Sequence, residues 1–172
     1  KFFIRPVTTN DLAMLQQISR QTFTETFAEV NTAENMAKYL EEELSLERLS
    51  AELSTPSSEF YFAVLNDQVI GYLKLNTGHA QTELKDSRAV EIERIYVSKA
   101  FHGKNIGQLL YEKAIRSARE KKAEYVWLGV WEENTKAIGF YKKNGFVEFD
   151  KHIFRLGEDE QTDIMMRKKV EY

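Results

Sequence analysis

A short loop, Phe101–Gly107, follows an apolar strand pattern and precedes a helical pattern. Gly103 and Gly107, with Asn105 between them, allow the backbone to approach a ligand closely and to adopt a positive φ. The N-terminus of the next helix offers unpaired N–H groups and the positive end of the helix dipole. The loop therefore predicts a pyrophosphate-binding site, although taken alone the same pattern also fits an ordinary strand-to-helix turn.

The charge around this loop favours an anionic ligand. Residues 99–122 contain seven lysines and arginines against two glutamates, in a chain with a net charge of −3. The loop is not a Walker loop, because Lys104 is followed by asparagine in place of serine or threonine, and no GxGxxG motif follows a strand.

Several other kinds of reactive site are excluded by residue type. The chain has no cysteine, so it forms no disulfide, no thiolate zinc site and no thioester with its own side chains. His79, His102 and His152 are far apart in the sequence and form no HExxH motif, so no metal site is predicted. Acyl transfer, if it occurs, is expected to be direct within a ternary complex.

A second segment, Trp127–Phe146, has the sequence WLGVWEENTKAIGFYKKNGF. Together with IERIYV at Ile92–Val97 and HGKNIG at His102–Gly107, it resembles the GNAT superfamily of acetyl-CoA-dependent N-acetyltransferases in order and spacing. The resemblance implies one domain, residues 1–172, of the α/β (α+β) class. Its central β-sheet would be mixed, V-splayed and flanked by helices, with acetyl-CoA entering where two parallel strands diverge.

The resemblance also implies which groups bind coenzyme A. The pantetheine amides would be hydrogen-bonded by main-chain groups of Ile95, Tyr96 and Val97. The pyrophosphate would lie against His102, Gly103, Lys104, Asn105, Ile106 and Gly107. Two further positions match residues that touch the pantetheine arm and the phosphates, Asn134 and Lys143. The chain departs from the family pattern in having His102 for Arg or Gln and Asn105 for glycine.

Acetylation of an alkylamine needs a proton acceptor, because such an amine is mostly protonated at neutral pH. Glu91 and Glu93 lie two apart on one strand, so they are predicted on one face, opposite Ile92 and Arg94. Glu93 aligns with the glutamate of some polyamine-acetylating relatives and is the predicted base. Alternatives are Glu91, a water chain, or a purely ion-paired Glu93. Relatives with the glutamate on the next strand would have it at Gly129.

The leaving thiolate needs a proton donor, and a phenol suits this role. Tyr141, in the segment AIGFY, stands where the resemblance places the general acid of the family, and the neighbouring Phe140 is expected in the core. The alternative for Tyr141 is a packed aromatic residue with its hydroxyl bonded elsewhere.

The elements that position these groups follow from hydrophobic periodicity and capping residues. Strands are predicted over 2–7, 60–65, 69–75, 90–97, 125–130, 146–149, 152–156 and 164–170. A tight turn at residues 66–67 joins the second and third strands. Helices are predicted to begin at Thr9 or Asn10, at Asn31, at Ser45, near Ile106 and at Asn134, the last of them ending at residues 144–145.

Composition sets the wider expectations. The 172 residues are 42% hydrophobic and 30% charged with both signs mixed, which suits one folded core and excludes a disordered chain. Net charge −3 argues against a broad nucleic-acid surface. No stretch approaches the roughly 20 apolar residues of a membrane helix, so a cytoplasmic protein with no membrane partner is expected.

Within the superfamily, the opening helices and the EDEQTD segment, Glu158–Asp163, resemble the bacterial Pai-type spermidine/spermine N-acetyltransferases. A polycation would be attracted by acidic residues near the expected acceptor channel, namely Glu25, Glu29, Glu41, Glu42, Glu43 and Glu83. The predicted function is therefore acetyl-CoA-dependent N-acetylation of a small amine such as spermidine. The alternatives are a peptide or protein N-acetyltransferase and a regulatory protein that binds acetyl-CoA with little turnover. The resemblance also makes a homodimer possible.

Overall fold

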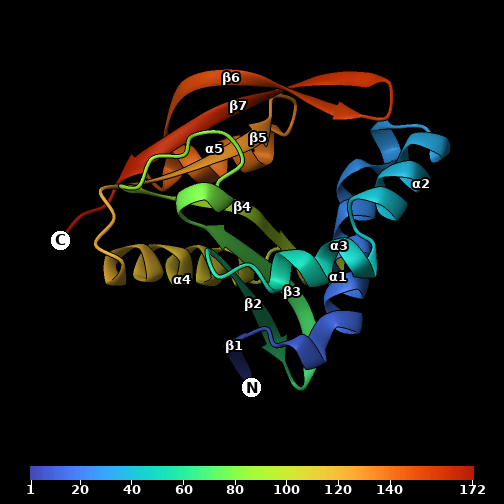
Figure 1. The fold of residues 1–172 in the computed structure, drawn as a ribbon, viewed down its shortest axis with the longest axis horizontal. Helices are drawn as coiled ribbons and strands as arrows, with labels where there is room; N and C mark the ends of the chain where they lie inside the picture. Colours follow the sequence, from blue (N-terminus) through green and yellow to red (C-terminus); the bar gives the residue numbers. More distant parts are fainter.

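Seven strands form one mixed β-sheet in the computed structural model, which describes residues 1–172 (Figure 1). Their order across the sheet is β1-β2-β3-β4-β5-β7-β6. The strands are β1 (Phe2–Pro6), β2 (Ser58–Leu65), β3 (Gln68–Asn76), β4 (Ala89–Val97), β5 (Tyr125–Trp131), β6 (Val147–Leu156) and β7 (Asp159–Lys169). This arrangement confirms the predicted α/β class with a mixed central sheet.

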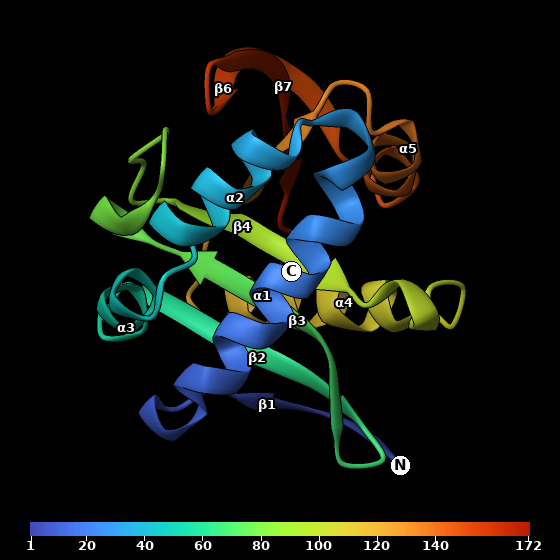
Figure 2. The same cartoon turned by 90° about the vertical axis from the view of Figure 1, so that its right-hand side faces the viewer.

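Five α-helices flank the sheet (Figure 2). Two separate hydrophobic cores lie on the two faces of the sheet. One core packs α4 and α5 against the sheet, and the other packs α1, α2 and α3 against the opposite face. The helices are α1 (Leu12–Phe27), α2 (Ala33–Glu42), α3 (Leu46–Leu53), α4 (Ile106–Glu120) and α5 (Thr135–Lys143). None of them combines the length and the apolar character needed to cross a bilayer.

The parallel pair β4 and β5 separates soon after it begins. Only three residue pairs join the two strands, of which Glu91 opposite Trp127 is the last. Strand β4 continues to Val97 and β5 to Trp131 without further pairing between them. The predicted V-shaped splay is confirmed, and beyond Glu91 it leaves β4 without a strand partner on its β5 side.

A β-bulge at Glu93 changes which face the later β4 side chains occupy. In the pairing with β3, Lys74 lies opposite Arg94, but the next residue of β3 lies opposite Ile92, so Glu93 is the extra residue. Ile92 and Ile95 both pack against the core under α4. The prediction that Arg94 faces away from Glu93 is therefore wrong, because the bulge shifts the alternation by one residue.

Helix starts and the last two strands also differ in part from the predictions. The second helix is capped by Thr32, whose hydroxyl accepts from the Asn35 N–H at 3.0 Å, so Asn31 is not its cap. The first helix follows a 3-10 turn capped by Thr8, one residue earlier than predicted. Ser45 caps α3 as predicted.

The predicted strands 146–149 and 152–156 are one strand, β6, interrupted by a bulge between Glu148 and Asp150. That bulge breaks the alternation that marks a continuous strand in the sequence. A turn at Gly157, which has φ +65°, leads directly into β7 at Asp159. The EDEQTD segment therefore lies in this hairpin, whereas the sequence pattern placed it before the last strand.

Candidate active site

The loop between β4 and α4 has the backbone geometry of an anion site. Gly103 and Asn105 have φ of +80° and +68°, so the positive φ predicted for Asn105 is confirmed. The first helical hydrogen bond runs from the Leu109 N–H to the Asn105 carbonyl. The backbone N–H groups of residues 103–108 donate to no backbone carbonyl. Such a run of free donors at a helix N-terminus fits a diphosphate.

Side chains hold this loop in place from both ends. The His102 Nε2 lies 2.8 Å from the Val97 carbonyl oxygen, which ties the loop to the end of β4. Ile106 is buried in the core under α4, whereas Lys104 is exposed. No heavy atom lies within 4 Å of a Cβ built on Gly107, so space remains beside it.

The β4 residues predicted to bind pantetheine lie on the open edge of the splay. Tyr96 and Val97 pair with Tyr72 and Gly71 of β3 on one side and have no strand partner on the other. A Cβ on Gly71 would be only 2.6 Å from the Tyr96 carbonyl oxygen, so a glycine is required where the two strands approach closely. Ile95 precedes them in the same open segment.

Helix α5 carries the other predicted contacts with the cofactor. Asn134 caps it, with its side-chain oxygen accepting from the Ala137 N–H at 3.2 Å, as predicted from the sequence. Lys143 is exposed at its last position. Gly145 follows with φ +97°, which supplies the left-handed residue expected at this helix end.

Tyr141 lies between these ends and is 7% exposed. Its ring packs at steep angles against Phe140 and Phe146, with centroids 5.4 and 5.6 Å away. Burial raises the pKa of Tyr141, and no hydrogen bond contributes to this shift. The hydroxyl is therefore protonated at neutral pH and is not engaged by another protein group, as a proton donor would require.

Glu93 lies in a buried network of four charges. Its carboxylate oxygens lie 2.7 Å from Lys74 Nζ and 3.2 Å from Arg94 Nη2, and Asn76 donates to it at 2.8 Å. Glu52 of α3 binds the same two cations at 2.9 and 3.1 Å. Burial raises the pKa of Glu93, but the two cations and the hydrogen bonds together lower it to about 2. This carboxylate is ionised at neutral pH but is a weak proton acceptor.

Glu91, the alternative base, is only 2% exposed and shares Asn76 with Glu93. Its carboxylate also accepts from the Thr82 N–H at 2.8 Å and from the Thr82 hydroxyl. Burial raises the pKa of Glu91, although these hydrogen bonds oppose the shift. Its contacts hold the segment that precedes β4 against the sheet.

The β6–β7 hairpin adds an acidic group that the sequence reading did not single out for chemistry. Asp163 of β7 is partly buried, and its Oδ2 lies 3.6 Å from His152 Nε2 of β6. Burial raises the pKa of Asp163 to about 6, against an opposing effect of His152. The two residues are eleven positions apart, and only the hairpin register brings them opposite each other.

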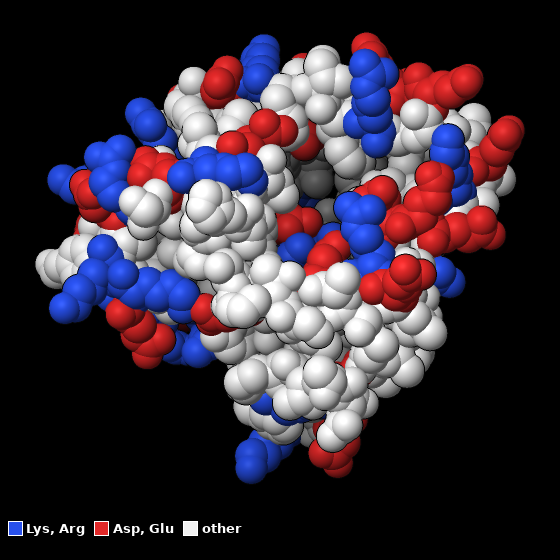
Figure 3. All heavy atoms as spheres, viewed as in Figure 1, with Lys and Arg blue, Asp and Glu red and all other residues white.

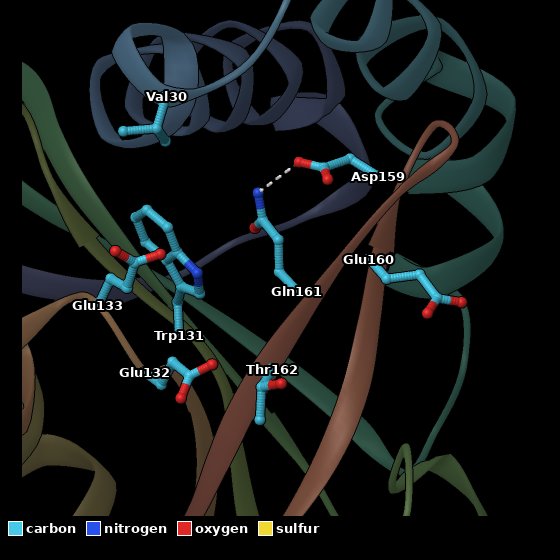
Figure 4. A pocket seen from close by; sticks show the side chains of 8 residues that line it. All are labelled: Val30, Trp131, Glu132, Glu133, Asp159, Glu160, Gln161 and Thr162. Carbon is cyan, nitrogen blue, oxygen red and sulfur yellow. Dashed lines mark hydrogen bonds between the residues drawn. The ribbon is translucent and has the colours of Figure 1, made fainter.

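An open pocket of about 260 Å³ lies between the end of α1 and the β6–β7 hairpin (Figure 4). Trp131 and Val30 are its apolar residues, and its polar lining consists of Glu132, Glu133, Asp159, Glu160, Gln161 and Thr162. None of these four acidic residues has a basic partner within the pocket lining. A cationic ligand suits this lining.

The six glutamates predicted to attract a polycation do not line this pocket. Glu42 and Glu43 line a neighbouring pocket with Tyr39 and Phe154. Glu25 accepts from the Lys99 N–H at 3.0 Å, and Glu83 approaches His152. Acidic atoms do gather over α2 and α3, beside the hollow beneath the β6–β7 hairpin (Figure 3).

Comparison with known proteins agrees with this geometry. The model of the acetyltransferase (GNAT) family matches residues 13–146. An uncharacterized N-acetyltransferase from the pepI 3′ region of Lactobacillus delbrueckii subsp. lactis is 43% identical over 164 residues, 95% of each chain. A spermidine N(1)-acetyltransferase of Thermoplasma acidophilum is 25% identical over 172 residues, 98% of this chain and 97% of that protein.

Among solved structures, the PaiA N-acetyltransferase of Thermoplasma acidophilum in complex with coenzyme A superimposes with a TM-score of 0.80. It is 25% identical, and the match covers 98% of this chain and 99% of that chain. The splayed sheet, the free N–H groups of the loop and the extent of the family match lead to one conclusion. The chain belongs to the GNAT family and is an acetyl-CoA-dependent N-acetyltransferase.

Proposed function

We propose that the chain transfers the acetyl group of acetyl-CoA to a small polycationic amine, with spermidine and spermine as representative acceptors. The observation that carries this proposal is the pocket at the end of β5, where four acidic residues and Trp131 contribute to the lining and only Glu160 has a cationic partner, Arg155. Carboxylates attract ammonium groups, and an indole face adds a cation–π contact. The 25% identity with a spermidine N(1)-acetyltransferase supports the same substrate class.

The chain's own residues account for cofactor binding in this proposal. The N–H groups of residues 103–108 hold the diphosphate, and the open edge formed by Ile95, Tyr96 and Val97 holds the pantetheine amides. Asn134 and Lys143, at the two ends of α5, contact the pantetheine arm and the phosphates. When bound, acetyl-CoA supplies the acetyl group as a reactive thioester.

Tyr141 and Glu93 are the two residues predicted from the sequence to transfer protons. Tyr141 donates from its free hydroxyl toward the departing sulfur, where its raised pKa keeps it protonated. Glu93 was the base predicted from the sequence, and this role stays a prediction. Its low pKa favours a role in which the ionised carboxylate holds Lys74 and Arg94 in place.

Thiol release from acetyl-CoA in the presence of spermidine tests the acceptor class. The double variant Glu132→Gln/Glu133→Gln removes two pocket charges, so KM for spermidine is expected to rise by about 10-fold or more while KM for acetyl-CoA is unchanged. Asp67→Asn/Glu120→Gln, which removes two exposed charges outside the pocket, is the matched control.

Two results would contradict the proposal. One is turnover of peptides with none of spermidine or spermine, which would indicate a peptide N-acetyltransferase. The other is binding of acetyl-CoA without release of thiol in the presence of any amine, which would indicate a regulatory protein.

A further inference from the structure

A second carboxylate, Asp163, lies beside Gly129 of β5, the strand that diverges from the β4 strand of Glu93. We propose that Asp163 accepts the proton that the acceptor ammonium loses before acyl transfer, and that His152 passes this proton toward solvent. The inference rests on the proposed acetylation of an amine, and it assigns the base to β7, a strand that carries none of the catalytic residues predicted from the sequence.

The neighbouring residue Gly129 of β5 shows where the Asp163 side chain lies. A Cβ built on Gly129 would lie 3.6 Å from Asp163 Oδ2 and 3.9 Å from His152 Cε1. Gly129 is two residues beyond Trp127, where pairing with β4 ends, just as Glu93 is two residues beyond Glu91. The Asp163 carboxylate therefore lies at van der Waals distance from the position that the Cβ of a residue-129 side chain would take, next to the strand that borders the gap.

The surroundings of Asp163 form a path from the site to solvent. Beyond the imidazole, His152 Nδ1 lies 3.7 Å from Glu83 Oε1, and it is a buried nitrogen with no hydrogen-bond partner. The exposed fraction of the side chain rises along the path, from 16% for Asp163 through 25% for His152 to 48% for Glu83. The Asp163–His152 and His152–Glu83 distances are both longer than a direct hydrogen bond. Hydrogen bonds between catalytic groups are often this long until substrate binds.

No other charged group competes for this carboxylate from the neighbouring strands. On the β6 side the residue opposite Asp163 is His152, and on the β5 side its neighbours are Trp131 and Gly129, which do not titrate. A pKa of about 6 leaves Asp163 ionised at neutral pH yet more basic than an ordinary aspartate. The cation-paired Glu93 is a far weaker base.

The chemical step balances with the groups present. An N–H bond of the ammonium breaks and an O–H bond forms on Asp163, which leaves a neutral amine and a neutral carboxylic acid. The electron pair of the amine forms the C–N bond to the acetyl carbon as the C–S bond breaks. The electron pair of the C–S bond remains on sulfur. Of the two protons that the nitrogen loses, one leaves through His152 and the other reaches sulfur through Tyr141.

The test compares pH profiles of kcat/KM for spermidine between wild type and Asp163→Asn. In the wild type the base must be ionised, so kcat/KM is expected to fall tenfold per pH unit below about pH 6. Asp163→Asn should lower kcat/KM at pH 7 by about 100-fold and remove the break near pH 6. The kcat/KM of the variant should instead rise tenfold per pH unit over the whole range up to pH 9, because only the free amine reacts.

Asp150→Asn of β6 makes the same chemical change at an exposed position and serves as the control. Calorimetry with coenzyme A should give the same affinity for all three proteins, which separates loss of the base from loss of the cofactor site. An Asp163→Asn variant that matches the control in rate and profile would overturn the proposal. So would loss of the break near pH 6 in Glu93→Gln with its retention in Asp163→Asn.

A second measurement requires neither turnover nor a stable variant. Carbon-13 NMR of the carboxyl groups of the wild-type chain, in the absence of substrates, should show one aspartate that titrates near pH 6. If every aspartate titrates below about pH 4.5, the proposal is overturned regardless of which amine is the acceptor.

Discussion

At the scale of single residues, the site separates its ionisable groups by environment. Tyr141 is buried among rings and protonated, Glu93 is ionised between two cations, and Asp163 lies partly buried with its pKa raised to about 6. Opposite pKa shifts in neighbouring groups are the usual sign of divided acid and base roles. Residue type in the sequence identified the first two groups, but the packing that shifts their pKa values could not be read from it.

Replacing Tyr141 with phenylalanine tests its proposed role. Because the hydroxyl makes no hydrogen bond to the protein, Tyr141→Phe should leave the free energy of unfolding within about 1 kcal/mol of wild type. It should lower kcat by about 100-fold with unchanged affinity for coenzyme A. Steady-state kinetics and calorimetry measure both quantities.

Tyr125→Phe is the control for this experiment, because the Tyr125 hydroxyl bonds Asp86 outside the site. Equal kcat for the two variants would show that Tyr141 only packs in the core.

At the scale of elements, periodicity and glycine punctuation were enough to locate α4, β5, α5 and the loop between β4 and α4. The β4 bulge was not predicted, because two consecutive polar residues, Glu93 and Arg94, do not by themselves show which residue is the extra one, and only the pairing with β3 reveals it. The β6–β7 hairpin was misjudged for a related reason, since its bulge divides one strand into two apparent ones. The bulge in β4 determines where Arg94 lies, and the bulge in β6 sets the register that places His152 opposite Asp163.

The loop makes a specific prediction at position 105. Asn105→Ala should destabilise the chain by about 1 kcal/mol, because alanine adopts a positive φ at a cost, and it should weaken coenzyme A binding. Asn105→Gly, the control, should retain both properties. Urea unfolding and calorimetry report them, and equal behaviour of the two variants would exclude a role for this backbone conformation.

The buried ion network, which links β3 and β4 to Glu52 of α3, makes a second prediction. Glu93→Gln leaves Lys74 and Arg94 with Glu52 as their only remaining carboxylate partner, so the free energy of unfolding should fall by about 3 kcal/mol. Glu160→Gln removes an exposed pair with Arg155 and should cost under about 1 kcal/mol. Similar losses in urea unfolding would show that the network contributes no more than a surface pair.

At the scale of the whole molecule, the sheet divides two cores, and the splay between β4 and β5 opens the site between them. The mixed sheet, its splay and the α/β class were predictable because the motifs are ordered along the sequence as in the GNAT family. The acid-lined pocket was not, because its residues come from three segments that meet only in the fold: Val30, residues 131–133 and residues 159–162.

The pH dependence of stability is a property of the whole molecule that depends on Asp163. Its folded pKa of about 6 lies above the ordinary 3.8, so the folded state holds its proton more tightly than the unfolded state does. The free energy of unfolding should therefore fall by at most about 3 kcal/mol as pH rises from about 4 to 6 and Asp163 ionises. Asp163→Asn should lack this decrease in urea unfolding, and an identical pH dependence in both proteins would contradict the shift.

The central claim is that this site acetylates a small polycation. The most direct measurement is a competition experiment. The chain and acetyl-CoA are incubated with an equimolar mixture of spermidine, an aminoglycoside and a lysine-containing tripeptide, and the products are identified by mass spectrometry. Acetylspermidine as the main product is the predicted result. Acetylated tripeptide or aminoglycoside with spermidine unchanged would contradict the claim.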